Sequence, residues 1–340
     1  MAEADPFAPA AAAGIHRLPI PTPFAVGRVN VYLVEDEPLT LIDSGPNSGT
    51  SLDQLERQLT ELGHRIEDLE LILVSHQHID HIGLVDILAR RSGANVAAID
   101  RLVPFVEGYR DAATADDEFA AELMLRHGIS PDVVQALRTV SQAARAWGAR
   151  ADVTRVLRDG EEIELRDRSL RVAFRPGHSP TDTVFHDAER RVLFAADHLL
   201  AEISSNPLLT RPLDGGERPR ALIDYLHSLS LTREMDVDLV LPGHGDPITN
   251  HRDLIDRRFA LHRRRADKIH ALIMERSRSA HELAQALWGD IAVSQAYLTL
   301  SEVIGHTDIL VSEGRVREVE ENGVVRYEAV PERETTEGTA

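Results

Sequence analysis

The sequence predicts an α/β fold followed by a C-terminal winged-helix module. Between Val29 and Ile99, short apolar runs of strand length alternate with segments that have the helical period, which is the order of an α/β domain. Strand-length runs return between residues 153 and 241. Beyond His251 the pattern changes to three helices and then two β-like runs, the order of a winged helix.

The expected strands of the first domain are short apolar runs bounded by polar turns. They are Val29–Val34, Leu39–Ile42, Leu71–Val74, Asn95–Ile99, Val153–Leu157, Glu162–Leu165, Leu170–Phe174, Thr183–Phe185, Val192–Ala195 and Val237–Leu241. Helical periodicity is found in Ser51–Leu62, in a segment that begins at Leu84 and in Pro219–Leu229. The first two strands are close enough in sequence to form a hairpin.

A helical insertion interrupts this alternation at about residues 103–150, with breaks at Gly108, Gly128 and Pro131. The C-terminal pattern has helices at His251–Met274, His281–Leu287 and Val293–Ile304, then β-like runs at Val311–Val319 and Val324–Val330. We therefore expect a flexible tail at 1–16, a main domain at 17–250, a winged-helix-like domain at 251–330 and a disordered tail at 331–340.

Composition restricts the function classes. The 340 residues carry a formal net charge of −19 and include no cysteine. Such a negative charge opposes binding to nucleic acid and to anionic lipid, and a metal site must use imidazole and carboxylate ligands. No apolar run approaches the roughly 20 residues of a membrane span, and the N-terminus lacks the positive charge of a signal peptide. We expect a cytoplasmic protein.

The clearest motif is Ser75-His76-Gln77-His78-Ile79-Asp80-His81, which directly follows a predicted buried strand. His76 and His78 are two residues apart, so in an extended segment they share a face. Asp80 and His81 follow where the chain turns and can be directed at a neighbouring point. Four polar residues on a solvated loop are the alternative interpretation, but the spacing favours a metal site.

Three more strand ends each supply one candidate ligand: His178 after Leu170–Phe174, Asp197 after Val192–Ala195 and His244 after Val237–Leu241. Singly, each could be a turn histidine or a capping aspartate. Four such positions at strand ends favour one common site.

These residues resemble, in order, the ligand pattern of the metallo-β-lactamase superfamily. The resemblance covers about residues 17–250 and implies an αββα metallo-β-lactamase sandwich with two divalent metal ions at one edge, zinc first, with iron and manganese as alternatives. It implies that His76, His78 and His178 hold one ion, that Asp80, His81 and His244 hold the second, and that Asp197 bridges them. Asp43 matches an acidic residue beside the site, where we expect it to orient a ligand imidazole. The chain departs from the family pattern at Ser75, usually threonine, and at Leu84, often glycine.

This ligand set predicts a hydrolase in which two cations share a bridging hydroxide as nucleophile. Asp80 is the candidate catalytic residue, since it can also accept or relay a proton. The full dinuclear pattern is similar to that of glyoxalase II, lactonases and ribonucleases. Secreted zinc β-lactamases use a cysteine or lack the bridging aspartate, which disfavours antibiotic hydrolysis.

We expect a small acyl substrate, namely a carboxylic ester, thioester or lactone. The main alternative is a phosphodiesterase or endoribonuclease of the β-lactamase-like 2 type, because some members of that group carry a C-terminal winged helix. A non-hydrolytic binding protein and an iron enzyme that consumes oxygen are further alternatives. Residues 251–340 contain 13 basic and 16 acidic residues, which disfavours a nucleic-acid partner.

The insertion and the loop Ile203–Gly216 are expected to wall the substrate pocket. The insertion is rich in apolar and aromatic side chains, namely Val103, Phe105, Val106, Tyr109, Phe119, Leu123 and Leu125. An apolar wall suits an acyl group better than an RNA strand. Alternatively, these side chains pack the insertion onto the sandwich or onto a second subunit of a homo-oligomer.

Overall fold

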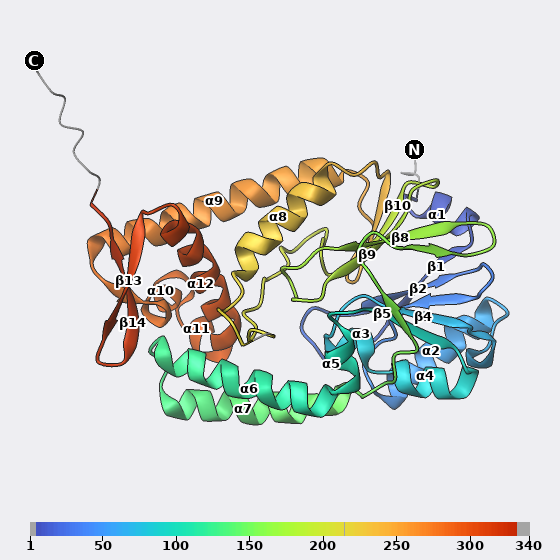
Figure 1. The fold of residues 1–340 in the computed structure, drawn as a ribbon, viewed down its shortest axis with the longest axis horizontal. Coiled ribbons are helices and arrows are strands. Elements are labelled where there is room, and N and C mark those ends of the chain that lie inside the picture. Colours follow the sequence, from blue (N-terminus) through green and yellow to red (C-terminus); the bar gives the residue numbers. More distant parts are fainter. Residues whose placement is uncertain (1–4, 214, 332–340) are drawn as a thin grey trace, which may run out of the picture.

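The computed structural model describes residues 5–213 and 215–331. Two β-sheets stack face to face, and helices cover both outer faces (Figure 1). A second, mainly helical body lies at the end of the molecule opposite the strand-rich part. The predicted α/β sandwich is therefore present, with a C-terminal region attached.

The first sheet has six strands in the order of the sequence, β1 to β6. They are β1 (Ile15–Ile20), β2 (Val29–Val34), β3 (Thr40–Ile42), β4 (Leu71–Val74), β5 (Asn95–Ile99) and β6 (Arg155–Leu157). The first three strands pair antiparallel, and β3 to β6 pair parallel. Strand β4 is buried along its whole length, as expected for a parallel strand that is covered on both faces.

The second sheet has the order β11-β10-β9-β8-β7. Its strands are β7 (Glu162–Glu164), β8 (Ser169–Phe174), β9 (Thr183–Asp187), β10 (Val192–Ala196) and β11 (Leu239–Pro242). Because β9 is antiparallel to both β8 and β10, and β11 is parallel to β10, strands β8, β10 and β11 run in one direction. Their carboxyl ends therefore meet at one edge of the sheet.

Three apolar clusters hold the layers of the sandwich together. The central one joins the inner faces of both sheets, with Leu73 and Phe194 among its members. The outer face of the first sheet packs against α2 (Gly49–Glu61), α4 (Val85–Ser92) and α5 (Val103–Glu107). The outer face of the second sheet packs against α8 (Ala221–Arg233) and the start of α9 (His251–Glu275). The remaining short elements of this part are α1 (Ala8–Ala12), η1 (Ile66–Asp68) and α3 (Ile79–Ile82).

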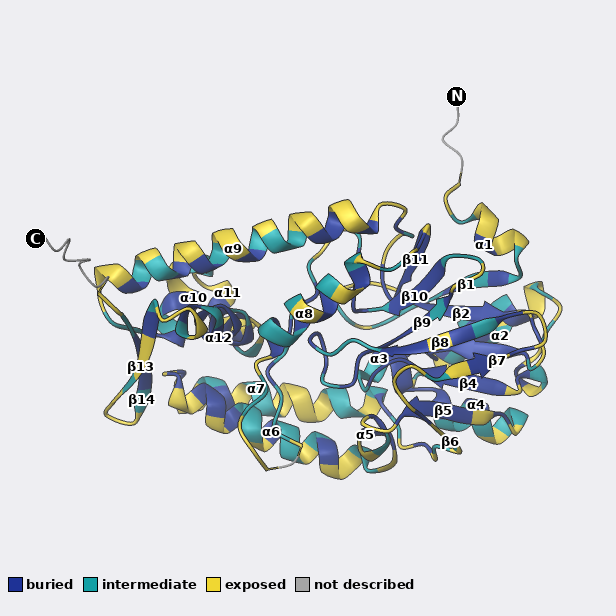
Figure 2. Ribbon diagram, turned by 45° about the horizontal axis from the view of Figure 1, so that its top comes forward, coloured by how far each residue is buried: buried dark blue, intermediate teal, exposed yellow. Residues whose placement is uncertain are grey.

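The insertion and the C-terminal region share a fourth core. The insertion contributes α6 (Tyr109–Arg126) and α7 (Pro131–Ala144), followed by η2 (Arg145–Trp147). The C-terminal region contributes α9 and the elements β12 (Arg278–Ser279), α10 (Ala280–Trp288), α11 (Ile291–Ser294), α12 (Ala296–Ser312), β13 (Val316–Glu321) and β14 (Val324–Ala329). Met124 of α6 lies in one apolar cluster with Ile269 and Leu300. Figure 2 shows the buried faces of α6 and α12 turned toward this shared interior.

Sequence predictions near both ends of the chain need correction. The predicted tail at residues 1–16 includes α1 and the start of β1, because Ala10 and Ile15 are buried; residues 1–4 lie outside the described part. The predicted β-like run at Val311–Val319 begins too early, since α12 continues to Ser312 and ends before Gly314, which has a φ of +71°. The predicted tail at 331–340 lies outside the described residues from position 332 on. Within the described ranges, no helix is long and apolar enough to cross a membrane.

Candidate metal centre

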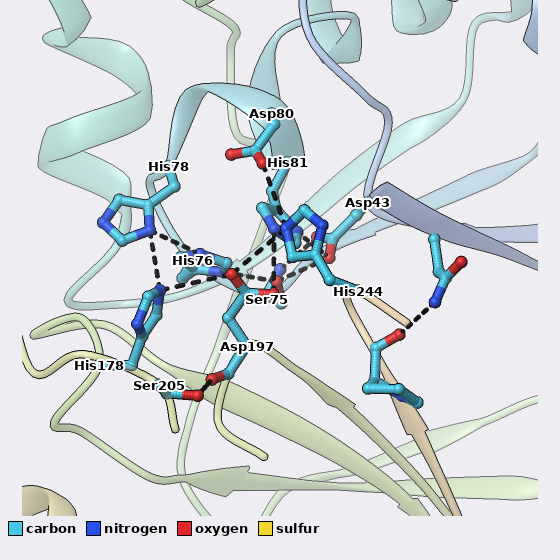
Figure 3. A network of polar contacts seen from close by, with 12 residues as sticks. Asp43, Ser75, His76, His78, Asp80, His81, His178, Asp197, Ser205 and His244 are labelled. Atoms are coloured by element: carbon cyan, nitrogen blue, oxygen red, sulfur yellow. Dashed lines mark hydrogen bonds and ion pairs between the residues drawn. The ribbon is translucent and has the colours of Figure 1, made fainter. Parts of the chain in front are cut away.

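Parallel strand ends bring the predicted ligands to one place between the two sheets. In the first sheet, β3 and β4 are parallel, and Asp43 and His76 follow their carboxyl ends. In the second sheet, the ends of β8, β10 and β11 are followed by His178, Asp197 and His244. Loops that leave a common sheet edge converge, so residues far apart in sequence become neighbours (Figure 3).

One group of donors consists of His76, His78, His178 and Asp197, with ligand atoms that all lie within 4.8 Å of one another. The Nδ1 atom of His78 lies 3.0 Å from Nε2 of His76 and 3.0 Å from Nε2 of His178. Three imidazole nitrogens that face one point at this spacing are the arrangement expected of zinc ligands.

The neighbouring group consists of Asp80, His81 and His244. His244 Nε2 lies 3.3 Å from the Oδ2 atom of Asp80. Asp80 occupies the first turn of the four-residue helix α3, and His81 follows it. The turn from β4 into α3 thereby divides the four motif residues between the two groups.

The carboxylate of Asp197 touches both groups. Its Oδ1 atom lies 3.5 Å from Nε2 of His81, and its Oδ2 atom lies 3.6 Å from Nε2 of His178 and 3.5 Å from Nε2 of His244. Asp197 therefore lies between the two groups of donors.

The orphaned atoms of the site fit bound cations. His81 Nε2, His244 Nε2 and Asp197 Oδ1 are buried and have no hydrogen-bond partner. Buried polar atoms without partners are costly, and all three belong to the donors just described. Imidazole and carboxylate donors are those that zinc, iron and manganese accept. The residues present therefore fit divalent cations.

A hydrogen-bond chain fixes the imidazole tautomers on both sides of the centre. The Oδ2 atom of Asp43 accepts from His81 Nδ1 at 2.8 Å and from the Ser75 hydroxyl at 2.8 Å. Since the Ser75 proton is used in this way, the contact of 2.9 Å between Ser75 Oγ and His76 Nδ1 is donated by His76. With both Nδ1 atoms protonated, the Nε2 lone pairs of His76 and His81 remain free for metal.

Backbone carbonyls fix the imidazole tautomers of two other ligands. His178 Nδ1 donates to the carbonyl of Asn206 at 3.3 Å, and His244 Nδ1 donates to the carbonyl of Arg28 at 2.8 Å. Each of these imidazoles again presents Nε2 to the centre.

The electrostatics of the two groups differ. Burial lowers the pKa of His76 well below its usual range, and His81 and His78 lower it further. Burial, followed by His178, lowers the pKa of His78 to about 3. These imidazoles are therefore neutral at pH 7 and available as ligands.

Around His81 the pKa shift has the opposite direction. Burial acts to lower the pKa of His81, but Asp43, Asp197 and Asp80 together raise it well above its usual range. Burial acts to raise the pKa of Asp197, and His81 and His244 hold it well below the usual carboxyl range. Three carboxylates thus converge on this group, and they favour a cation here.

Close backbone approaches explain two glycines of the site. A Cβ on Gly243 would lie 2.2 Å from Oδ1 of Asp197, so only glycine leaves room for the bridging carboxylate. A Cβ on Gly177 would lie 2.3 Å from Cα of Tyr225 in α8. These contacts press the His178 turn against α8 and the His244 turn against Asp197.

A third set of possible donors, His262, Glu302 and His306, lies between α9 and α12. Here the nitrogens already have partners: His262 Nε2 contacts the Ser204 hydroxyl at 3.3 Å, its Nδ1 contacts His306 Nε2 at 3.2 Å, and His306 Nδ1 donates to the carbonyl of Glu302 at 2.6 Å. Arg265 forms an ion pair with Glu302. We interpret this set as a closed hydrogen-bond chain that joins two helices.

The structure places Asp43 and all seven predicted ligands at the centre, and it packs several of the apolar side chains named for the insertion into cores. Phe105 and Val106 pack into the core of the sandwich, and Leu123 packs into the core shared with the C-terminal region. Of the apolar side chains named for the insertion, Leu125 is the one with large exposure, at 43%. The alternative interpretation, packing, therefore applies to most of the insertion.

Sequence reasoning missed two participants. Ser75 links His76 to Asp43, and Asn206 holds His178 through its carbonyl group. The family preference for threonine at the position of Ser75 was the available signal, because threonine also carries a hydroxyl group.

Comparison with known proteins agrees with the ligand pattern. The model of the metallo-beta-lactamase superfamily matches residues 25–244. The chain belongs to this superfamily. It is 32% identical to "Probable metallo-hydrolase YqjP" of Bacillus subtilis (strain 168), over 92% of this chain and 96% of that protein. The crystal structure of the metallo-beta-lactamase family protein TTHA1429 from Thermus thermophilus superposes with a TM-score of 0.78 and 28% identity, covering 93% of this chain and 99% of the other.

A more distant relative is "Acyl-coenzyme A thioesterase MBLAC2" of Homo sapiens. The identity is 29% over 184 residues, which cover 50% of this chain and 58% of that protein. This metallo-beta-lactamase superfamily chain thus carries His and Asp groups that can hold divalent metal ions.

Proposed function

We propose that this superfamily member is a metal-dependent hydrolase of carboxylic esters, with thioesters as the first substrate class and lactones as close alternatives. The two donor groups and the bridging position of Asp197 support hydrolysis. The named activity of the human relative supports the thioester class. Zinc is the proposed metal, because three imidazoles and a carboxylate suit its tetrahedral coordination.

When bound, divalent cations at this site would activate a water molecule and polarise a carbonyl oxygen. The chain's own residues supply the rest of the chemistry. Asp80 is 7% exposed and lies 3.3 Å from His244 Nε2, so its carboxylate can take up a proton beside the reacting atoms and release it to the leaving thiolate or alkoxide. Asp43, Ser75 and two backbone carbonyls keep the ligand imidazoles in one orientation.

The observation that carries the choice of substrate is the pairing of arginines in the C-terminal region. Seven of them lie within 4.0 Å of a carboxylate of the same region: Arg263, Arg265, Arg276, Arg278, Arg315, Arg317 and Arg326. A surface that binds nucleic-acid phosphates needs unpaired positive charge. These seven arginines are already paired, which supports a small acyl substrate over an RNA strand.

The test is a substrate panel with metal-reconstituted protein. An acyl thioester, an aryl ester, a lactone and a bis(aryl) phosphate are compared by kcat/KM. We expect the thioester or another carboxylic substrate to exceed the phosphate diester by at least about 100-fold, which corresponds to about 2.7 kcal/mol of transition-state stabilisation. Asp80→Ala should lower the main activity by about 10³-fold or more, whereas Glu189→Gln, a change at an exposed carboxylate remote from the centre, should not alter it.

A reversed order, with the phosphate diester as the best substrate, would favour the phosphodiesterase alternative. Equal rates in the Asp80→Ala variant would show that the observed activity does not come from this centre.

A further inference from the structure

An irregular segment, residues 203–209, connects the metal centre with the C-terminal helices. We call it the strap. It contains no helix or strand, so its conformation depends on the contacts that its own atoms make. Ser205 and Leu209 are buried, with 3% and 2% exposure.

On one side the strap holds two candidate metal ligands. The Ser205 hydroxyl donates to the backbone carbonyl of Asp197. The Asn206 carbonyl accepts from His178 Nδ1 at 3.3 Å, and the Leu208 amide donates to the carbonyl of His178 at 3.4 Å. Figure 3 shows Ser205 beside Asp197, on the side where His178 also lies.

On the other side helix α12 holds the strap. The side-chain amide of Asn206 donates to the carbonyl of Leu298 at 3.1 Å. The Tyr297 hydroxyl donates to the carbonyl of Leu209, and the Leu209 amide donates to the Ser301 hydroxyl at 3.3 Å.

Helix α9 adds two contacts at the start of the strap. The guanidinium group of Arg258 donates to the carbonyl of Ile203 at 2.8 Å and also to two carbonyls just before it. His262 Nε2 accepts from the Ser204 hydroxyl at 3.3 Å. The C-terminal helices thus hold both ends of the segment that contacts His178 and Asp197.

The other donor group has different supports, all from the sandwich. His81 is held by Asp43, and His244 Nδ1 is held by the Arg28 carbonyl. The turn before His244 is held by Tyr32, whose hydroxyl donates to the carbonyl of Pro242 at 2.8 Å. Among the hydrogen bonds of the described residues, none joins Asp80, His81 or His244 to the C-terminal helices.

We propose that helices α9 and α12 position His178 through the strap, and thereby set the metal affinity of the His76–His78–His178 group in preference to that of the Asp80–His81–His244 group. Tyr297 and Asn206 are the positioning residues. The proposal concerns metal binding and is independent of which substrate the enzyme hydrolyses. Loss of a residue that contacts a metal ligand directly costs about 10–100-fold in metal affinity. Tyr297 is one contact further away, so we expect a loss of affinity at the lower end of this range.

The experiment measures metal binding by the full-length chain. Metal-free protein is titrated with Zn²⁺ against a competing chelator, and with Co²⁺, whose visible absorption reports on its ligands. His178→Ala and His244→Ala first assign the two binding steps to the two groups. In Tyr297→Phe we expect the dissociation constant of the His178 group to rise about 10-fold, while that of the His244 group stays within about twofold.

Tyr32→Phe is the matched control, because it also removes one hydroxyl that donates to a backbone carbonyl. It should weaken the His244 group and leave the His178 group unchanged. In Tyr297→Phe, raising the metal concentration should restore turnover, since the ligands themselves are intact.

Asn206→Ala is the second variant if Tyr297→Phe fails to fold, as judged by circular dichroism of the apo-protein. Equal weakening of both groups in the strap variants would overturn the proposal, because it would indicate general loosening of the fold. Unchanged affinities in both variants would overturn it as well.

Discussion

Asp43 is the side chain from which the tautomers of two ligands are set, and replacing it tests the whole arrangement. Asp43→Asn keeps the shape of the side chain. The backbone should tolerate it, because Asp43 has a φ of +63° and asparagine readily adopts this region. The change places an N–H donor where the Oδ2 atom now accepts from His81 and from Ser75.

The loss can be estimated from these contacts. An amide group that donates to His81 Nδ1 moves the imidazole proton to Nε2, the atom that lies 3.5 Å from Asp197. The Ser75 hydroxyl can then no longer donate to residue 43, so it donates to His76 Nδ1 instead. This moves the imidazole proton of His76 to its Nε2 atom as well. We expect each group to lose about 10–100-fold in metal affinity, or about 1.4–2.8 kcal/mol at 1.4 kcal/mol per factor of ten.

Chelator competition with Zn²⁺ measures both constants. Ser75→Ala should weaken mainly the group that contains His76, and Ser75→Thr should bind metal like the natural protein because it keeps the hydroxyl group. If Asp43→Asn binds two ions with natural affinities, the tautomer chain has no part in metal binding and the reasoning fails.

Three further perturbations have defined outcomes. Asp80→Ala should lower kcat on the best substrate by about 10³-fold or more, since it removes a ligand and a proton acceptor together, and excess metal should not restore it; recovery at high Zn²⁺ would refute the proton role. Gly243→Ala should reduce metal occupancy in elemental analysis, because its Cβ would lie 2.2 Å from Asp197 Oδ1; full occupancy would contradict the close approach. Burial, followed by Arg218 and Arg126, lowers the pKa of His127 to about 3, so its contribution to stability is complete above about pH 6.5 and is lost as the pH falls toward 3. Between pH 7 and pH 5 the free energy of unfolding of the metal-free protein should therefore fall by about 2 kcal/mol more than in His127→Phe, and equal decreases in urea titrations would refute this.

The interior strands could be predicted closely because burial on both faces leaves a continuous apolar run. Leu71–Val74 and Asn95–Ile99 have the predicted bounds. Strand β1 was missed, since Pro19 interrupts its apolar pattern and Pro21 directly follows its end. Pro19 is tolerated because β1 lies at an edge of the sheet, where a missing amide donor costs little. The predicted helix ended at Ile304, but α12 continues through Gly305. Gly305 is in close contact with Leu222 of α8.

The candidate ligands were predictable because each follows a strand end, where a short motif is visible in the sequence. Their supports were not. Asn206 and Tyr297 act through hydrogen bonds to backbone atoms distant in sequence, and such contacts leave no spacing pattern. The role of the insertion also depended on tertiary packing, since an apolar helix face looks the same whether it lines a pocket or a core.

The core shared by α6 and the C-terminal helices has a consequence for biosynthesis. Met124 is translated well before Ile269 and Leu300, the partners that bury it. At about 5–20 residues per second, the apolar face of α6 stays uncovered on the ribosome for on the order of ten seconds. During that time the sandwich can fold only while the apolar face of α6 remains exposed. Truncated chains that end before α12 should therefore aggregate or be degraded. The stability of the N-terminal part thus depends on helices that are encoded at the end of the gene.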